Sequence, residues 1–239
     1  MANTNLKFTP SSTGNKDKWT WSAWVKIGKI GADENLFTGY DASTFYTEIQ
    51  IGDTGKLNYI NKISGSEQGK IETNRVFRDP SAWYHFVIIW DSGNATAGNR
   101  MRIYVNGVEE TSFATDTNPS LNQDSALPHA ARPLYIGSWG QSSKYFSGSM
   151  ANVEFVDGQA YGPEYFGSTD SNTGIWKPGG SSTISDYGTN GFKLKMDTTT
   201  PGADTSGKNN NFTVDTGTPT LTQGSPSNVY ANLNSIALT

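Results

Sequence analysis

The sequence predicts an all-β protein in which two antiparallel sheets pack face to face. Only 17% of the 239 residues are charged, whereas 12% are aromatic and 26 residues are glycine. This composition is typical of short strands joined by turns. Several segments alternate apolar and polar residues with a period of two, which indicates strands buried on one side. Helix signals are almost absent, and residues 162–167 predict only one or two helical turns.

The first strands follow from these alternations. Residues 18–27 place Trp19, Trp21, Ala23, Val25 and Ile27 on one face and Thr20, Ser22, Trp24 and Lys26 on the other, so the first face is predicted to be core. Residues 48–60 predict a hairpin around the glycine-bounded turn 52–55. Residues 83–90 are apolar on both faces and predict a central strand that is covered from two sides.

Four more strands complete the predicted sandwich. Residues 100–105 and 108–113 flank Asn106-Gly107, the pair best suited to a type I′ hairpin turn. Residues 134–137 predict a short strand. Residues 150–156 predict a strand with the following inward side chains: Ala151, Val153 and Phe155.

Composition excludes several functional classes. The formal net charge is −4 and basic residues are scattered, so we expect no nucleic-acid partner. The absence of cysteine excludes disulfides, thiolate metal sites and a cysteine nucleophile. Residues 1–14 lack the pattern of a secretory signal and no apolar stretch is long enough to cross a bilayer, so we expect synthesis in a cytoplasm and no membrane insertion.

The composition changes near residue 196. We therefore expect a sandwich over residues 1–196 and a segment rich in Thr, Asn and Gly over residues 197–239. That segment cannot form a core of its own, so it is either a flexible tail or an extended arm that packs on the sandwich or on a neighbouring subunit. We favour the arm, because apolar residues continue to the terminus. Its predicted partner-binding residues are Val229, Tyr230, Leu233, Ile236 and Leu238.

The strand motifs resemble a known superfamily. TWSAWVKI (20–27), AWYHFVIIWD (82–91), MRIYVNGVEE (101–110) and LYIGSWG (134–140) are similar to concanavalin A-like lectins and glucanases, including laminin-G-like modules. The resemblance implies a concanavalin-like jelly roll, an antiparallel β-sandwich that would here carry an extended C-terminal arm.

A narrower resemblance is to members encoded by bacteriophages. It is carried by TNRVFRDPSAWYH (73–85), FVDGQAYGPEYFG (155–167), GIWKP (174–178) and YGTNGFKL (187–194) in that order. Lys195-Met196 departs from this pattern, where an acidic and an aromatic residue are usual.

This resemblance implies a non-enzymatic structural protein of a virion surface. It would be a capsid decoration or a fibre component, made in the host cytoplasm, with other virion proteins and copies of itself as partners. The alternative is a host-recognition lectin that binds a cell-surface polysaccharide.

No catalytic residue is predicted. The Glu-x-Asp-x-x-Glu strand of related glucanases is missing, and Glu154 and Asp157 are separated by an odd number of positions, so they face opposite sides of a strand. His85 lies in a strand predicted to be buried and is expected to be a hydrogen-bonded core residue. His129 follows Pro128 in a loop, where solvent exposure is expected.

Exposed aromatic faces beside amide groups are typical of sugar sites. The predicted ligand-binding residues are Trp139, Gln141, Tyr145 and Tyr40, all in glycine-rich connections. In the alternative, Trp139 and Tyr145 cap the open end of the sandwich. The Asp and Asn clusters at 91–94 and 116–118 could supply calcium ligands, but such clusters are more typical of ordinary turns. We therefore assign no metal and no cofactor.

Overall fold

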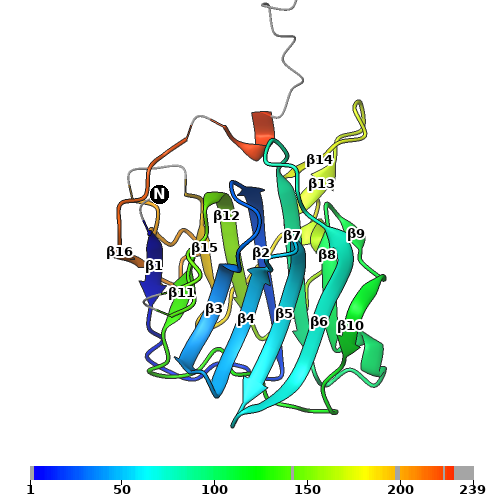
Figure 1. Ribbon diagram of the computed structural model, residues 1–239, viewed down its shortest axis with the longest axis vertical. Coiled ribbons are helices and arrows are strands. Elements are labelled where there is room, and N and C mark those ends of the chain that lie inside the picture. Colours follow the sequence, from blue (N-terminus) through cyan, green and yellow to red (C-terminus); the bar gives the residue numbers. More distant parts are fainter. Residues whose placement is uncertain (1–2, 141–142, 197–199, 223, 229–239) are drawn as a thin grey trace, which may run out of the picture.

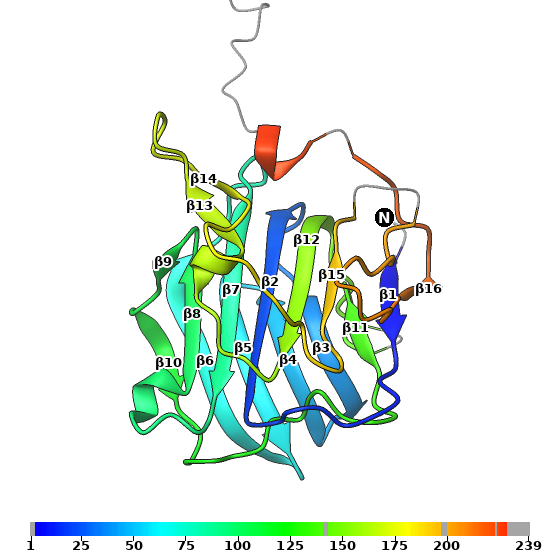
Figure 2. The same ribbon diagram turned by 180° about the vertical axis from the view of Figure 1, so that it is seen from behind.

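The computed structural model describes residues 3–140, 143–196, 200–222 and 224–228. Two antiparallel sheets lie face to face, and Figures 1 and 2 show the larger sheet from the front and the smaller sheet from behind. The predicted all-β sandwich is therefore confirmed. No helix in these described ranges has the length and apolar character needed to cross a membrane.

The larger sheet has eight strands in the order β10 (Phe113–Thr117), β6 (Ser66–Val76), β5 (Lys56–Ile63), β4 (Phe45–Ile51), β3 (Glu34–Ala42), β11 (Leu134–Ile136), β1 (Asn5–Phe8) and β16 (Thr213–Thr216). The smaller sheet has six strands in the order β15 (Phe192–Leu194), β12 (Gly148–Asp157), β2 (Lys18–Ile27), β7 (Tyr84–Asp91), β8 (Met101–Val105) and β9 (Val108–Glu109). A separate hairpin consists of β13 (Gly167–Thr169) and β14 (Trp176–Pro178). Three short 3₁₀ helices are η1 (Ala97–Asn99), η2 (Pro163–Tyr165) and η3 (Pro226–Asn228).

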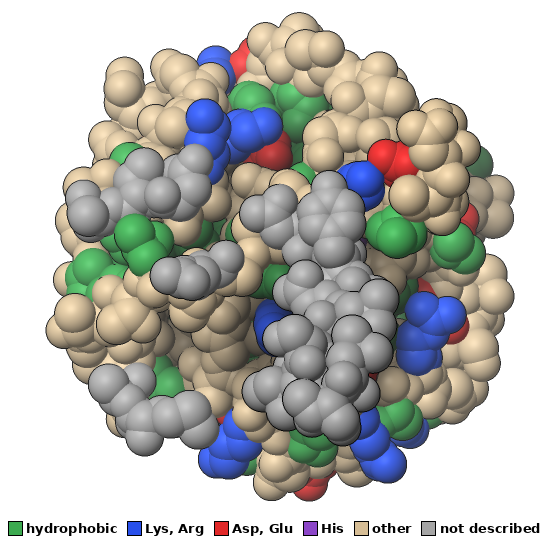
Figure 3. Space-filling model, turned by 90° about the horizontal axis from the view of Figure 1, so that it is seen from above, with side chains coloured by type: hydrophobic (Ala, Val, Ile, Leu, Met, Phe, Trp, Pro, Cys, Tyr) green, Lys and Arg blue, Asp and Glu red, His purple; other side chains and the backbone are tan. Residues whose placement is uncertain are grey.

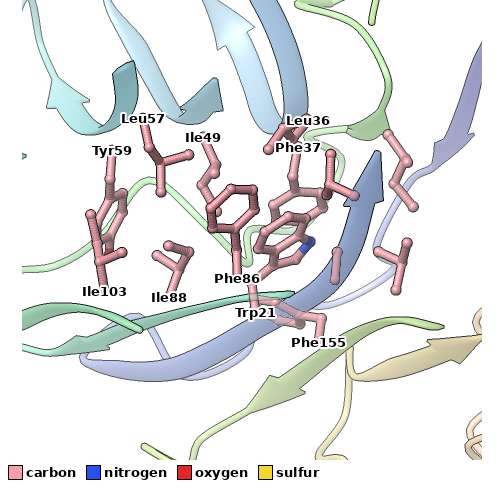
Figure 4. Close-up of a cluster of buried hydrophobic side chains, with 14 of the residues drawn as sticks. Trp21, Leu36, Phe37, Ile49, Leu57, Tyr59, Phe86, Ile88, Ile103 and Phe155 are labelled. Atoms are coloured by element: carbon pink, nitrogen blue, oxygen red, sulfur yellow. The ribbon is translucent and has the colours of Figure 1, made fainter. Parts of the chain in front are cut away.

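The core lies between the two sheets. Figure 4 shows Trp21 and Phe86 of the smaller sheet facing Phe37 of the larger one, and Ile103 of the smaller sheet facing Tyr59. All five side chains are fully buried. The inward face predicted for residues 18–27 is confirmed, since each of its five apolar residues belongs to this core.

The opposite face of β2 is also buried, which the sequence did not predict. The segment 158–190 crosses the outer face of the six-stranded sheet and packs Phe166 and Tyr187 against Val87 and Ile89. Ser22 and the neighbouring polar residues of β2 therefore lie beneath a second, smaller apolar layer. The central position predicted for β7 is confirmed by its pairing with β2 on one side and β8 on the other.

Turn chemistry sets two strand boundaries. Asn106 and Gly107 both have positive φ (50° and 81°), which confirms the predicted type I′ turn. The strand predicted over 108–113 is wrong, because β9 ends at Glu109 and the chain then crosses to the other sheet, where Phe113 begins β10.

One inward residue was assigned incorrectly. The pairing of β12 with β2 shifts between Ala151 and Glu154, and Asn152 has a φ of 47°. This β-bulge inverts the alternation that the sequence implies. Met150, not Ala151, consequently packs against the core, whereas Val153 and Phe155 lie inward as predicted.

The C-terminal segment adds an edge strand to the larger sheet. β16 pairs with β1, and Phe212 packs between Phe8 and Phe192 with centroid distances of 5.4 and 4.7 Å. From β16 the chain passes over the upper end of the sandwich in Figure 1 to η3, beside β14. The five predicted partner-binding residues lie outside the described residues, and the division at residue 196 stays a prediction.

Candidate functional site

The described parts of the connection between β11 and β12, residues 137–140 and 143–147, fold back over the outer face of the eight-stranded sheet. Thr38 Oγ1 donates to the Ser138 carbonyl over 3.1 Å, and the Asn35 amide donates to the Lys144 carbonyl over 2.8 Å. The Trp139 amide donates to the Ser143 carbonyl, which closes the loop on itself. The described parts of the loop are thus hydrogen-bonded to β3 at two points, one on each side of residues 141–142.

Three aromatic side chains meet under this loop. The Trp139 ring contacts Tyr40 of β3 and Tyr46 of β4 edge to face, with centroid distances of 5.3 and 5.2 Å. Trp139 and Tyr40 are half-buried, whereas Tyr46 is buried. These three residues form the aromatic cluster.

A partly buried ion-pair network lies next to the aromatic cluster. Lys144 Nζ is 3.0 Å from Glu48 Oε1, 3.0 Å from Gln50 Oε1 and 3.4 Å from Asp33 Oδ2. The same ammonium lies 4.8 Å from the centre of the Trp139 ring. Burial raises the pKa of Glu48, and the nearby Lys144 opposes that shift. Lys144 therefore connects the aromatic cluster to Glu48 of β4 and to Asp33, which directly precedes β3.

A pocket of about 340 Å³ opens on the other side of Lys144, where β3 and β12 begin. We call it the end pocket, and it lies at the end of the sandwich that Figure 3 shows from above. On that face basic and acidic side chains are dispersed. The pocket is lined by Asn3, Lys29, Ala32, Asp33, Glu34, Lys144, Tyr145, Phe146 and Ser147.

Glu34 is the most enclosed ionisable residue of the end pocket. It is 2% exposed, and its Oε2 accepts the backbone N–H of Ser147 over 3.2 Å. Burial raises the pKa of Glu34, while the hydrogen bonds from Ser147 and the charge of Lys29 lower it. The pocket thus contains a carboxylate that is fixed in position.

The predicted ligand-binding residues divide between these two places. Trp139 and Tyr40 are in contact, and Tyr145 lines the end pocket on the far side of Lys144. Gln141 lies outside the described residues. Sequence reasoning missed Tyr46, Glu48 and Lys144, although the alternation of residues 45–51 places Tyr46, Glu48 and Gln50 on one face of the strand.

His85 is fully buried, as predicted, and stacks between Trp24 and Trp176. Trp176 Nε1 donates to His85 Nδ1 over 2.9 Å, so the ring proton is on Nε2 and is donated to Ser22 Oγ, also 2.9 Å away. In this tautomer His85 cannot accept a proton from Ser22. The pair is therefore a structural hydrogen bond and not an activated nucleophile. His129, expected to be exposed, is half-buried because its ring packs against Phe45.

Three other acidic residues considered in the sequence, Glu154, Asp157 and Asp116, have structural partners. Tyr187 donates to Glu154 Oε2 over 2.5 Å, whereas Asp157 accepts the backbone N–H groups of Asn15 and Asn190. Asp116, which lies in β10 and not in a turn as expected, accepts a hydrogen bond from the Asn118 side chain. Throughout the described part of the chain, no three His, Asp or Glu side chains are placed to hold a metal ion.

Residues 1–163 match the concanavalin A-like lectin/glucanases superfamily. No curated protein matches the sequence. A structure assigned as a candidate carbohydrate-binding protein from Bacteroides ovatus is 17% identical, with a TM-score of 0.53, over 90% of this chain and 58% of that one. The chain thus spans little more than half of that protein. At this identity the similarity shows the shared fold alone, over nearly the whole chain.

Two further structures have lower TM-scores. A heptameric SAP-like pentraxin from Limulus polyphemus is 18% identical, with a TM-score of 0.48, over 67% of this chain and 72% of that one. The enzymatically active domain of tailspike protein 2 from bacteriophage CBA120 is 14% identical, with a TM-score of 0.43, over 63% of this chain and 24% of that one.

Proposed function

This chain belongs to the concanavalin A-like lectin/glucanases superfamily, and on that premise we propose that it is a non-enzymatic module that binds a glycan. The proposal rests on one observation. An aromatic cluster on the outer face of the eight-stranded sheet, of which Trp139 and Tyr40 are half-buried, lies beside a pocket with polar walls, and Lys144 connects the two.

The chemistry of this surface suits a sugar chain. The apolar face of a pyranose ring stacks on aromatic side chains, while its hydroxyl groups bond to amides and carboxylates at the rim. From Tyr40 to Glu34 the site follows β3 over ~20 Å, given ~3.3 Å per strand residue. That length favours an oligosaccharide over a single sugar.

Binding without hydrolysis is supported by the arrangement of the carboxylates. Glycoside hydrolysis uses two carboxyl groups that flank the scissile bond. At this site Glu48 and Asp33 share the Lys144 ammonium, which occupies the space between them. Glu154 and Asp157, the acidic pair of β12, have separate hydrogen-bond partners away from this site.

A glycan screen on the purified protein tests this proposal. We expect weak binding at each site and stronger retention when several copies are displayed together, because multivalency multiplies weak contacts. A screen of host polysaccharides, neutral, acidic and amino-bearing, in which nothing is retained would refute carbohydrate recognition.

A finer proposal concerns where the module works. The ordered phage-type motifs support a role on the surface of a bacteriophage particle, as a capsid decoration or a fibre component. The partners would be other virion proteins and further copies of this chain, with synthesis in the host cytoplasm. Neighbouring genes for a major capsid, portal or tail protein, together with the chain in purified particles, are the expected observations. Particles that lack the chain would contradict the role.

A further inference from the structure

We propose that the end pocket selects glycans that carry a free amino group, with the Glu34 carboxylate as the counter-ion of the ligand's ammonium. This inference rests on the proposed function, because it names the sugar class that the same site takes.

Glu34 is the fixed charge of the pocket. Its carboxylate is held by the Ser147 amide and is almost fully enclosed by protein. None of the ion pairs within the described ranges includes Glu34, and Lys29 acts on it only as a nearby charge. A buried carboxylate without an ion-pair partner is costly to maintain, so a cationic group that reaches it is stabilised.

Lys144 is already engaged by protein partners, with hydrogen bonds to Glu48 and Gln50 and an ion pair with Asp33. An ammonium group has three N–H donors, and Glu48, Gln50 and Asp33 lie around this one at 3.0, 3.0 and 3.4 Å. The second lysine, Lys29, is exposed on the loop between β2 and β3. The positive charges at the pocket are therefore either already paired or exposed to water, where they are screened.

The local charge balance also favours a cationic ligand. Around the pocket three carboxylates, Asp33, Glu34 and Glu48, face two ammonium groups, Lys29 and Lys144. A uronic acid or a sulfated sugar would add a fourth negative group beside Glu34. An amino sugar instead supplies the missing positive charge. The pocket volume of about 340 Å³ lies at the lower end of small-molecule sites, which suits a terminal sugar unit.

The test compares three oligosaccharides of equal length by calorimetric titration of the intact protein. They are a glucosamine tetramer, its fully N-acetylated counterpart and a galacturonate tetramer. At about pH 6 aliphatic amines are protonated and ordinary carboxyl groups are ionised. We expect the glucosamine tetramer to bind about tenfold tighter than the N-acetylated one, as a charge-assisted contact implies. The galacturonate tetramer should bind most weakly.

Substitutions assign this preference to Glu34. Glu34→Gln should remove the difference between the amino and N-acetylated ligands, whereas Glu109→Gln, the same charge change at an exposed position of β9, should leave it intact. Lys29→Ala removes the competing cation and should keep or widen the preference. If Glu34→Gln does not fold, the ligand comparison on the wild type and on the Lys29→Ala protein still tests whether the pocket prefers an amino sugar.

Two failures are distinguishable. A wild-type protein that binds the N-acetylated or the acidic tetramer as tightly as the amino form overturns the inference but leaves glycan binding standing. The same holds for a preference that survives in the Glu34→Gln protein. If no glycan of any class binds, the proposed function itself fails.

Discussion

The indole N–H of Trp176 donates to Nδ1 of His85 over 2.9 Å, joining residues that are 91 positions apart in the chain. Trp176 begins β14 and His85 lies in β7, so this bond ties the β13–β14 hairpin to the outer face of the six-stranded sheet. The indole also covers Gly107 and Gly167, where an added Cβ would lie 2.6 and 2.5 Å from the ring. Backbone without side chains at these positions allows the tryptophan to lie flat against the sheet.

Trp176→Phe removes the donor but keeps an aromatic ring. We expect unfolding free energy to fall by about 1–3 kcal/mol, since the buried Nδ1 then has no hydrogen-bond partner. Urea denaturation gives this value. Trp24→Phe is the matched control, because Trp24 stacks on the same imidazole while its own Nε1 has no hydrogen-bond partner. Equal losses in the two proteins would show that the hydrogen bond contributes nothing.

His85 also makes stability depend on pH. Burial lowers its pKa from 6.5 to about 3. Between these values the unfolded chain binds a proton that the folded protein does not, so stability falls as the pH decreases through this window. The slope is about 1.4 kcal/mol for each pH unit.

Urea midpoints between pH 7 and 5, where most carboxyl groups stay ionised, isolate this contribution. His85→Gln, which retains one acceptor and one donor, should flatten the slope. Parallel slopes in the two proteins would contradict the assignment.

Lys144 compensates a buried charge. Lys144→Met leaves the Glu48 carboxylate, whose side chain is 2% exposed, without its counter-ion, and should cost roughly 2–4 kcal/mol. The loss should shrink as pH falls, because protonation of Glu48 removes the uncompensated charge. Chemical denaturation at pH 7 and pH 5 measures both effects. The double substitution Lys144→Met with Glu48→Gln should recover part of the stability, and simple additivity of the two single losses would count against a coupled pair.

Two truncations separate the edge strand from the residues beyond it. A chain that ends at Gly202 loses β16 and Phe212, which is 5% exposed, and should lose about 3–5 kcal/mol of stability. A chain that ends at Asn228 keeps both, together with η3, and should melt like the full protein. On the virion proposal, the shorter deletion removes Val229–Leu238 and abolishes assembly onto the particle. A protein without these residues that still assembles would exclude the arm.

The sequence was sufficient to predict the fold because the signals are local. Alternation identifies the inward face of β2, and Asn106-Gly107 identifies a turn that requires two positive φ values. The errors come from non-local or backbone events. The bulge at Asn152 turns Met150, and not Ala151, toward the core. Nothing in the sequence pattern marks the point after Glu109 where the chain crosses to the other sheet.

Half of the predicted site is brought together in space. Trp139 and Tyr40 were identified as aromatic residues in glycine-rich connections, and the loop between β11 and β12 places them in contact. Lys144 and Glu48 were missed because they are 96 positions apart. Each residue alone resembles an ordinary surface charge, and only the folded loop shows that they form a pair.

Glycan binding on the outer face is tested most directly by one titration. The glycan retained best in the screen is titrated into the wild type, Trp139→Ala and Tyr161→Ala, the last removing a ring that stacks on Tyr165 beside the six-stranded sheet. Binding should weaken about tenfold or more in Trp139→Ala, as for a central aromatic contact, and should be unchanged in Tyr161→Ala. Equal affinity of all three proteins would contradict recognition at the aromatic cluster.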